Sequence, residues 1–154
     1  MAEGARLANE YDFLEFNNLF TSGRREIEDR KGSELWVKLE SLGNSASEIF
    51  KEYLSNERKA LIVGEYCDYP LGFMLVEIVN INQEKAANIQ EVFVDMEARD
   101  VGLGEVIMDH AIEWSRSKGA SVLLGRAFPG DRATKNNFER FHITARLIEV
   151  SKKI

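Results

Sequence analysis

The fold is best inferred from one stretch, Val92-Phe93-Val94-Asp95-Met96-Glu97-Ala98-Arg99-Asp100-Val101-Gly102-Leu103-Gly104-Glu105. Alternating side chains up to Val94 predict a strand, and apolar residues at three- and four-residue spacing from Leu103 predict a helix. Two glycines lie where this helix begins. The stretch therefore predicts a strand that runs through a short loop into the N-terminus of a long helix.

The start of that helix has the properties of an anion-binding site. The first N–H groups of a helix have no partner within the helix, and they lie at the positive end of its dipole. Glycine lets a bulky anion approach the backbone closely, and Arg99 adds a permanent positive charge. Together these features predict a site for a pyrophosphate group.

Three glycine-rich motifs can be compared with this segment. A Walker loop ends in Gly-Lys-Ser/Thr, whereas this chain has Gly104-Glu105-Val106. A dinucleotide-binding fingerprint requires a third glycine, where Ile107 stands here, and an acidic residue about 20 positions further on, where the chain is apolar. The remaining motif, Arg/Gln-x-x-Gly-x-Gly/Ala, is matched fully by Arg99, Gly102 and Gly104.

The residues before this stretch predict helices and then an antiparallel meander. A first helix capped by Asn9 is expected to begin near residue 10 and to end near Gly32. A second helix is expected to be capped by Ser45 or Ser47. Between them, a short strand or a hinge into the second helix is expected at Trp36, Val37 and Leu39. Strands are predicted at 60–64, 71–79 and 88–94, with turns at 67–70 and 80–84.

The residues after the stretch predict a β-α-β arrangement. The helix over 102–118 is expected to stop at Gly119, and a short buried strand is expected at 121–124. Asp131 can cap a further helix, anchored by Phe138 and Phe141, and a last strand is expected at 145–150. Residues 1–154 therefore predict a single α/β domain with a mixed central sheet and helices on both faces.

Three segments together resemble the GNAT superfamily of N-acetyltransferases over nearly the whole chain. Arg6-Leu7-Ala8-Asn9-Glu10-Tyr11-Asp12 is similar to the family's first strand and the start of its first helix. The strand, the loop and the Arg99-x-x-Gly102-x-Gly104 pattern form the strongest match. Phe138-Glu139-Arg140-Phe141-His142-Ile143 lies where the family has Phe/Leu-Tyr-Glu-x-x-Gly-Phe.

The resemblance implies an enzyme that uses acetyl-CoA as co-substrate. It places the pyrophosphate at the segment 99–105 and the pantetheine arm along the backbone of residues 92–94, beside a splay between the fourth and fifth strands. The expected cofactor-binding residues are Val92, Phe93, Val94, Arg99, Asp100, Val101, Gly102, Leu103, Gly104, Glu105 and Asp131. The thioester is already activated, so the protein has mainly to position an amine and stabilise an oxyanion.

The acid/base half of the family pattern is absent. Phe138 stands at the position of the family's tyrosine acid, and His142 at that of its glycine. Arg126 or Ala127 stands where many members have a glutamate base, and Asp131 where they have asparagine.

Glu91 is the best candidate for a catalytic base. Strand alternation places Glu91 on the same side as Ile89 and Phe93, on a strand that borders the expected cleft. An apolar setting would raise the pKa of its carboxyl group toward the working range. The alternative is a partly exposed sheet carboxylate or an ion-pair partner of Arg99.

Two functions follow from these features. The first is transfer of an acetyl or similar short acyl group from acetyl-CoA to a primary amine, by direct attack on the thioester. The alternative is a non-catalytic CoA-binding or regulatory module, motivated by Phe138 and the missing glutamate. A small amine, an antibiotic, a peptide N-terminus and a protein lysine all remain open as acceptors.

Composition limits the classes of molecule that can be partners of this protein. A net charge of -6 disfavours nucleic acid and weakly favours a cationic acceptor. No membrane span or signal peptide is expected, and the single cysteine, Cys67, fits a reducing cytoplasm. His110 and His142 stand apart, so no metal site is expected. Pairing of the strand edge at 145–150 with a second copy would give a homodimer.

Overall fold

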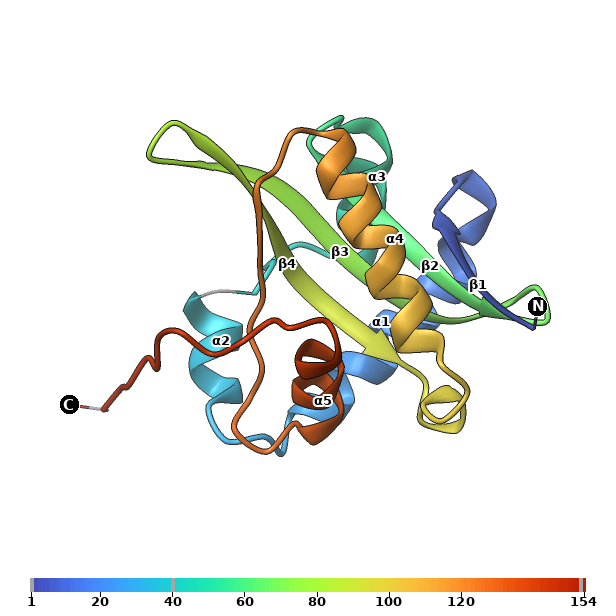
Figure 1. Ribbon diagram of the computed structural model, residues 1–154. Coiled ribbons are helices and arrows are strands. Elements are labelled where there is room, and N and C mark those ends of the chain that lie inside the picture. Colours follow the sequence, from blue (N-terminus) through green and yellow to red (C-terminus); the bar gives the residue numbers. More distant parts are fainter. Residues whose placement is uncertain (1, 40, 153) are drawn as a thin grey trace.

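The computed structural model describes residues 2–39, 41–152 and 154, and it contains one five-stranded sheet (Figure 1). The strands are β1 (Glu3–Leu7), β2 (Lys59–Tyr66), β3 (Tyr69–Ile81), β4 (Glu84–Val94) and β5 (Val122–Leu124), and they lie side by side in this order. Neighbouring strands are antiparallel except β4 and β5, which are parallel. The prediction of a mixed sheet, a meander followed by β-α-β, is confirmed.

Helices cover both faces of this sheet. On one face lies α4 (Leu103–Ser117), which connects β4 to β5 (Figure 1). The opposite face is covered by α1 (Phe13–Ile27) and α3 (Ala46–Ser55). The remaining elements are the helices α2 (Ser33–Leu39) and α5 (Arg132–Arg140) and two 3-10 turns, η1 (Glu10–Asp12) and η2 (Met96–Ala98).

The side chains of β3 show how the sheet separates two apolar cores. Phe73 and Leu75 pack with α1 and α3, whereas Met74 and Val76 pack with α4, and all four are completely buried. Successive side chains of a strand point to opposite faces, so a continuous apolar run serves both layers at once. The predicted placement of helices on both faces is therefore confirmed.

Several local signals act as the sequence predicts. β1 leads through η1 into α1, as expected for the segment from Arg6 onward. The side chains of Asn9, Ser45 and Asp131 accept hydrogen bonds from backbone N–H groups at the starts of η1, α3 and α5. Gly119 follows α4 with a φ of 87°, a left-handed conformation that favours glycine.

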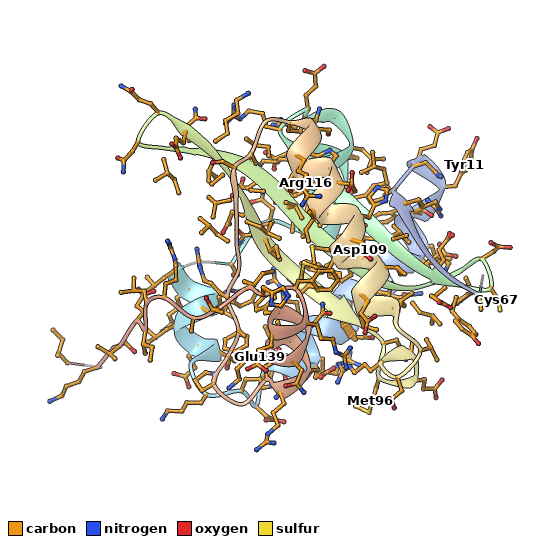
Figure 2. The ribbon with its side chains drawn as sticks, viewed as in Figure 1. Tyr11, Cys67, Met96, Asp109, Arg116 and Glu139 are labelled. Atoms are coloured by element: carbon orange, nitrogen blue, oxygen red, sulfur yellow. The ribbon has the colours of Figure 1, made fainter. Side chains whose placement is uncertain are left out.

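Both predicted strand turns are present, and they are tight. Cys67 and Asp68 have φ values of 50° and 64°, and Asn82 and Gln83 have values of 50° and 70°. Positive φ at both central residues is typical of the hairpin turns whose twist matches that of the flanking strands. Cys67 is exposed at the tip of the β2–β3 hairpin (Figure 2).

The strand or hinge expected at Trp36, Val37 and Leu39 is wrong, because these residues belong to α2. Gly32 has a φ of 90° and reverses the chain after α1. Trp36 packs edge-on against Phe128, with ring centroids 5.8 Å apart. Tertiary contact of this kind overrides the β propensity of a short apolar run.

The strand expected at 145–150 is also wrong, because the structure assigns no strand among the described residues after α5. Leu147, Ile148 and Val150 are 83–88% exposed. A strand needs a partner for its backbone groups, and β5 is only three residues long. The homodimer that was inferred from this segment stays a prediction without the strand on which it was based.

β5 itself lies where it was predicted, but it is not the buried strand that was expected. Val122 is 44% exposed and Leu124 is half-buried, because β5 forms an edge of the sheet.

Candidate active site

The connection from β4 to α4 forms the predicted anion-binding segment. Asp95 follows β4, and its side chain accepts a hydrogen bond from the N–H of Glu97 within η2. Gly102 then precedes α4 with a φ of 82°, in the left-handed region that side chains rarely adopt. The segment thus turns from a strand into a helix within nine residues, and the N-terminus of α4 lies beside the end of β4.

The backbone at Gly102 is open to a ligand. A Cβ atom added at Gly102 would meet no atom within 4 Å, whereas one at Gly104 would lie 3.4 Å from the Asn137 side chain. Asn137 Nδ2 also donates to the carbonyl oxygen of Gly104 over 3.2 Å, which ties α5 to the first turn of α4. An open backbone at a helix N-terminus fits the pyrophosphate group of coenzyme A.

Arg99 is held by the protein itself. Its Nη2 donates to both carboxylate oxygens of Glu26 over 2.7 and 2.6 Å, and its Nε donates to the carbonyl oxygen of Val94 over 3.0 Å. The guanidinium also lies over the ring of Phe93, 5.8 Å from its centroid. Arg99 thus joins the loop to α1 and to the end of β4, and a direct contact with phosphate stays a prediction.

A second cation near this segment, Arg140, was not among the predicted site residues. Its Nη1 lies 2.7 Å from Oε1 of Glu105 in the first turn of α4, and both side chains are about half exposed. Arg140 belongs to the six-residue segment that resembles the family's last helix, so its position could have been inferred from that segment.

β4 and β5 are paired over only three residues each. Ala86, Ala87 and Asn88 pair with Val122, Leu123 and Leu124, and the parallel ladder stops there. Residues 92–94 pair with β3 on their other side. The edge of β4 that faces away from β3 therefore extends past β5, in the position where the resemblance places the pantetheine arm.

An irregularity in β4 changes which side chains share a face. Leu75 pairs with Glu91 and Val76 pairs with Ile89, so Gln90 is an extra residue in β4. A bulge of this kind shifts the alternation of side chains by one residue. Ile89 consequently packs in the α4 core and Phe93 in the α1 and α3 core. The prediction that Ile89, Glu91 and Phe93 lie on one side is wrong for Ile89.

Glu91 lies on the α1 face of the sheet and forms an ion pair. Arg24 of α1 donates to its carboxylate from Nε over 2.9 Å and from Nη2 over 2.8 Å. The Glu91 side chain is only 9% exposed. Burial raises the pKa of its carboxyl group, and the bond to Arg24 opposes this shift. Arg99 was the ion-pair partner expected from the sequence, whereas the partner in the structure is Arg24.

Phe138 occupies a closed position at the end of β5. A Cβ atom at Gly125 would lie 2.7 Å from Cζ of Phe138, so the tip of the ring points directly at the backbone of Gly125. Phe138 is 8% exposed and packs within the α4 core. His142, four residues further along the same motif, has a φ of 59°. It adopts the left-handed conformation at the position where the family has glycine.

Asp131 uses its carboxylate to cap α5. Oδ1 accepts from the N–H of Thr134 over 3.1 Å, and Oδ2 accepts from its hydroxyl group over 2.7 Å. The predicted helix cap is confirmed, and the predicted cofactor contact stays a prediction.

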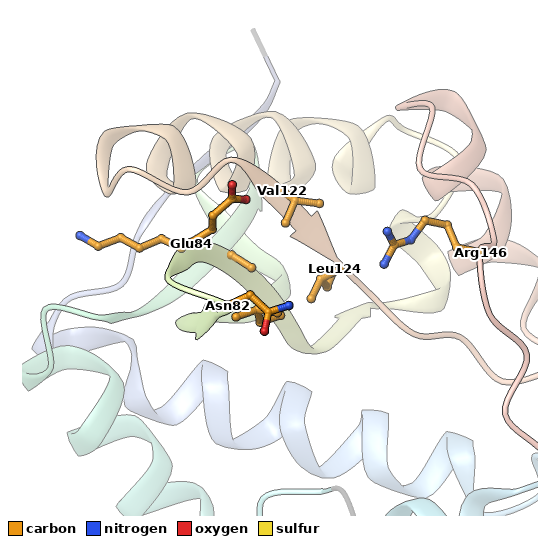
Figure 3. A pocket seen from close by; sticks show the side chains of 8 residues that line it. Asn82, Glu84, Val122, Leu124 and Arg146 are labelled. Atoms are coloured by element: carbon orange, nitrogen blue, oxygen red, sulfur yellow. The ribbon is translucent and has the colours of Figure 1, made fainter.

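Other features lie outside this site. A cavity of about 380 Å³ lies at the N-terminal end of β4, with Asn82, Glu84, Val122, Leu124 and Arg146 in its walls (Figure 3). Over the described ranges, no group of three or more His, Cys, Asp or Glu side chains is placed to hold a metal ion. No helix in the same residues is long and apolar enough to cross a membrane.

A mixed sheet with a parallel β4–β5 pair, an open glycine at a helix N-terminus and an edge of β4 that extends past β5 defines the GNAT class of acetyltransferase folds. Comparison with known sequences agrees, because the model of the acetyltransferase (GNAT) family matches residues 23–142. The chain belongs to this family, and its domain is an acetyltransferase domain of the GNAT type.

The chain is also similar to individual proteins. An uncharacterized N-acetyltransferase of Methanocaldococcus jannaschii is 30% identical over 77 residues, which is 48% of this chain and 34% of that protein. A solved glucosamine-6-phosphate N-acetyltransferase from Arabidopsis thaliana has a TM-score of 0.71 at 19% identity, covering 99% of both chains. A transcriptional regulator from Bacillus halodurans C-125 has a TM-score of 0.74 at 18% identity, again covering 99% of both chains. These two structures share the fold with this chain.

Replacing Phe138 by tyrosine is expected to destabilise the protein. The added hydroxyl group would extend from Cζ toward the backbone of Gly125, where there is no room for it. Overpacking of this kind costs about 1–3 kcal/mol in the free energy of unfolding. Urea denaturation of wild type and Phe138→Tyr measures the difference. Equal stability would show that the ring tip has free space and that a tyrosine hydroxyl fits there.

Proposed function

We propose that this protein transfers the acetyl group of acetyl-CoA to a primary amine. The observation that carries the proposal is the open backbone at Gly102, at the start of α4 and beside the free edge of β4. Membership of the GNAT family supports the same donor. Acetyl-CoA supplies an activated thioester. The remaining tasks of the protein are to bind and orient the two substrates and to deprotonate the amine.

Two parts of the chain would bind acetyl-CoA. The backbone N–H groups at Leu103 and Gly104, at the positive end of the α4 dipole, would hold the pyrophosphate. The free edge of residues 92–94 would hydrogen-bond the amide groups of the pantetheine arm as an added strand does. Arg99, fixed by Glu26 and the Val94 carbonyl, would keep the loop and the strand edge in register.

Glu91 would take the proton of the attacking amine. Its carboxylate lies on the α1 face of β4, one residue after the bulge. Burial raises the pKa of this group, so it is a better proton acceptor than an exposed glutamate. A primary amine is a cation near neutral pH, and a buried carboxylate is suited both to attract it and to deprotonate it.

A second candidate is a CoA-binding module without catalysis. The observation that favours it is Phe138, which has no proton to donate to a leaving thiolate and whose ring tip is closed off by Gly125. The two functions differ in one product. Incubation with acetyl-CoA and a panel of alkylamines, diamines, aminoglycosides and lysine peptides releases free thiol only if transfer occurs, whereas a binding module gives affinity without thiol.

Gly102→Glu is expected to abolish acetyl-CoA binding in calorimetric titration. A carboxylate there would occupy the open space at the helix N-terminus and repel the pyrophosphate. Gly43→Glu is the matched control, because Gly43 is exposed and open but lies between α2 and α3. Side chains at the φ of Gly102 cost about 1–2 kcal/mol, so thermal unfolding must first show that the variant is folded. Wild-type affinity in folded Gly102→Glu would place the cofactor elsewhere.

Glu91→Gln is expected to keep acetyl-CoA affinity and to lower turnover by about 10²-fold or more, the usual size of a general-base contribution. The wild-type rate should rise with pH through the pKa of Glu91, because only the ionised carboxylate accepts a proton. This rise should be missing in the variant. Glu77→Gln, on the same face of the neighbouring strand β3, is the control and should keep both rate and profile. An unchanged rate in Glu91→Gln would leave deprotonation to solvent.

A further inference from the structure

Arg24 covers the carboxylate of Glu91 and has an unusual set of neighbours. Besides its two bonds to Glu91, its Nη2 lies 3.4 Å from the carbonyl oxygen of Leu42. Its guanidinium carbon lies 4.5 Å from the ring centroid of Phe20 and 4.9 Å from that of Trp36. The Arg24 side chain is nevertheless 23% exposed, so its outer part reaches solvent.

These neighbours would attract cations in general. A buried carboxylate, two aromatic faces and a backbone carbonyl are the groups by which proteins bind ammonium and guanidinium ions. Trp36, on α2, also contacts Phe128 on the connection from β5 to α5. The group of Glu91, Phe20, Trp36 and the Leu42 carbonyl, which we term the cation seat, is thus assembled from four separate parts of the chain.

A cavity leads to the residue that occupies the cation seat. Its volume is about 360 Å³, it lies between α1 and α2, and its walls include Arg24, Ile27, Glu28, Glu34 and Val37. A molecule that enters this cavity meets Arg24, the side chain that covers Glu91. The Glu28 carboxylate and the apolar surface at Ile27 and Val37 are compatible with a cationic group on an alkyl chain, and the ammonium group of Lys38 lies in the same lining.

We propose that Arg24 is a displaceable positioning residue, which holds the Glu91 carboxylate until the cationic group of the acceptor takes its place in the cation seat. This inference rests on the proposed acetyl transfer with Glu91 as base. It implies that the acceptor amine binds as an ammonium ion and loses its proton in the cation seat.

The exchange of cations puts a group beside Glu91 that can give up a proton. The Arg24 guanidinium cannot give up a proton, and while it is bonded to Glu91 it opposes the rise in pKa that burial causes. An ammonium ion in the same place can give a proton to the Glu91 oxygen. The nitrogen lone pair then forms the bond to the thioester carbonyl carbon, and the carbon–sulfur bond breaks with its electron pair going to sulfur. The second proton that the nitrogen loses passes to the thiolate, directly or through water, to give a neutral amide and a free thiol.

The other groups that face Glu91 do not replace Arg24. Leu75, its partner on β3, is uncharged. Tyr53 of α3 lies close enough for Glu91 to affect it, but burial first, and then the nearby carboxylates, raise the pKa of its hydroxyl group, so it is neutral near pH 7. Arg24 is the charged partner that the structure gives Glu91 among the described residues.

The first test measures the pKa of Glu91 directly, by carbon NMR of a protein labelled at glutamate carboxyl carbons, with Glu91→Gln used for assignment. Arg24→Met keeps the length of the side chain and removes its charge, and it should raise the pKa of Glu91 by about one unit or more. Arg25→Met, at the exposed neighbouring arginine of α1, is the control and should leave that pKa unchanged. Equal pKa values in wild type and Arg24→Met would overturn the proposal.

The second test asks whether the cation seat accepts a free cation. In Arg24→Ala, methylguanidinium chloride should lower the pKa of Glu91 back toward the wild-type value, whereas N-methylurea, which has a similar shape and no charge, should not. An equal response to both compounds would show that the response does not depend on charge. A response to neither would show that the seat admits no external cation. Either result would overturn the proposal.

The third test links the seat to turnover. The pH at which kcat/KM rises should move upward in Arg24→Met by the same amount as the pKa of Glu91, because kcat/KM reports the pKa of the free protein, in which Arg24 still holds Glu91. Arg25→Met should keep the wild-type profile. A purely structural Arg24 would lower the rate without moving the profile, which would contradict the proposal. Absence of thiol release with every amine would instead defeat the proposed acetyl transfer, whatever the first two tests show.

Discussion

The extra residue in β4 is the constraint on which the rest of the site depends. Because Gln90 is inserted opposite the Leu75–Val76 step of β3, the side chains before it and after it belong to different alternations. Residues 87 and 89 serve the α4 core, and Phe93 serves the opposite core. The shift turns Glu91 toward α1, and Glu91 lies three residues past Asn88, the last residue at which β4 pairs with β5. One irregularity thus combines a buried carboxylate with a free strand edge.

Helix α1 connects the two halves of the site through charges two residues apart. Arg24 binds Glu91, the proposed base, and Glu26 binds Arg99 in the loop that we propose to hold the pyrophosphate. Arg30, one turn further on, lies 3.4 Å from Glu26 and donates to the carbonyl oxygen of Gly130 in the connection from β5 to α5. The close contact between Gly23 and Phe93 brings α1 near enough to the sheet for these bonds to form. The position of α1 therefore affects both the proposed base and the proposed cofactor loop.

Local signals in the sequence predicted the parts of the structure that depend on local physics. Gly102 and Gly119 have the positive φ expected of glycines that flank a helix, and Asp131 caps α5 through its own side chain. The bulge was not predictable, because the sequence of an apolar strand with one extra residue still shows alternating side chains. The Arg24–Glu91 pair joins residues 67 positions apart, so no local pattern reveals it. The segment 145–150 has the composition of a strand, but its structure depends on a partner that β5 is too short to provide.

The central claim is that the start of α4 and the adjoining edge of β4 bind coenzyme A. Backbone amide chemical shifts recorded during a titration with coenzyme A test it most directly, because each N–H group reports its own surroundings. The largest shifts are expected at residues 99–105 and 92–94, with small changes along the cavity near Arg146. Shifts confined to that cavity, or saturation without any change at Leu103 and Gly104, would contradict it.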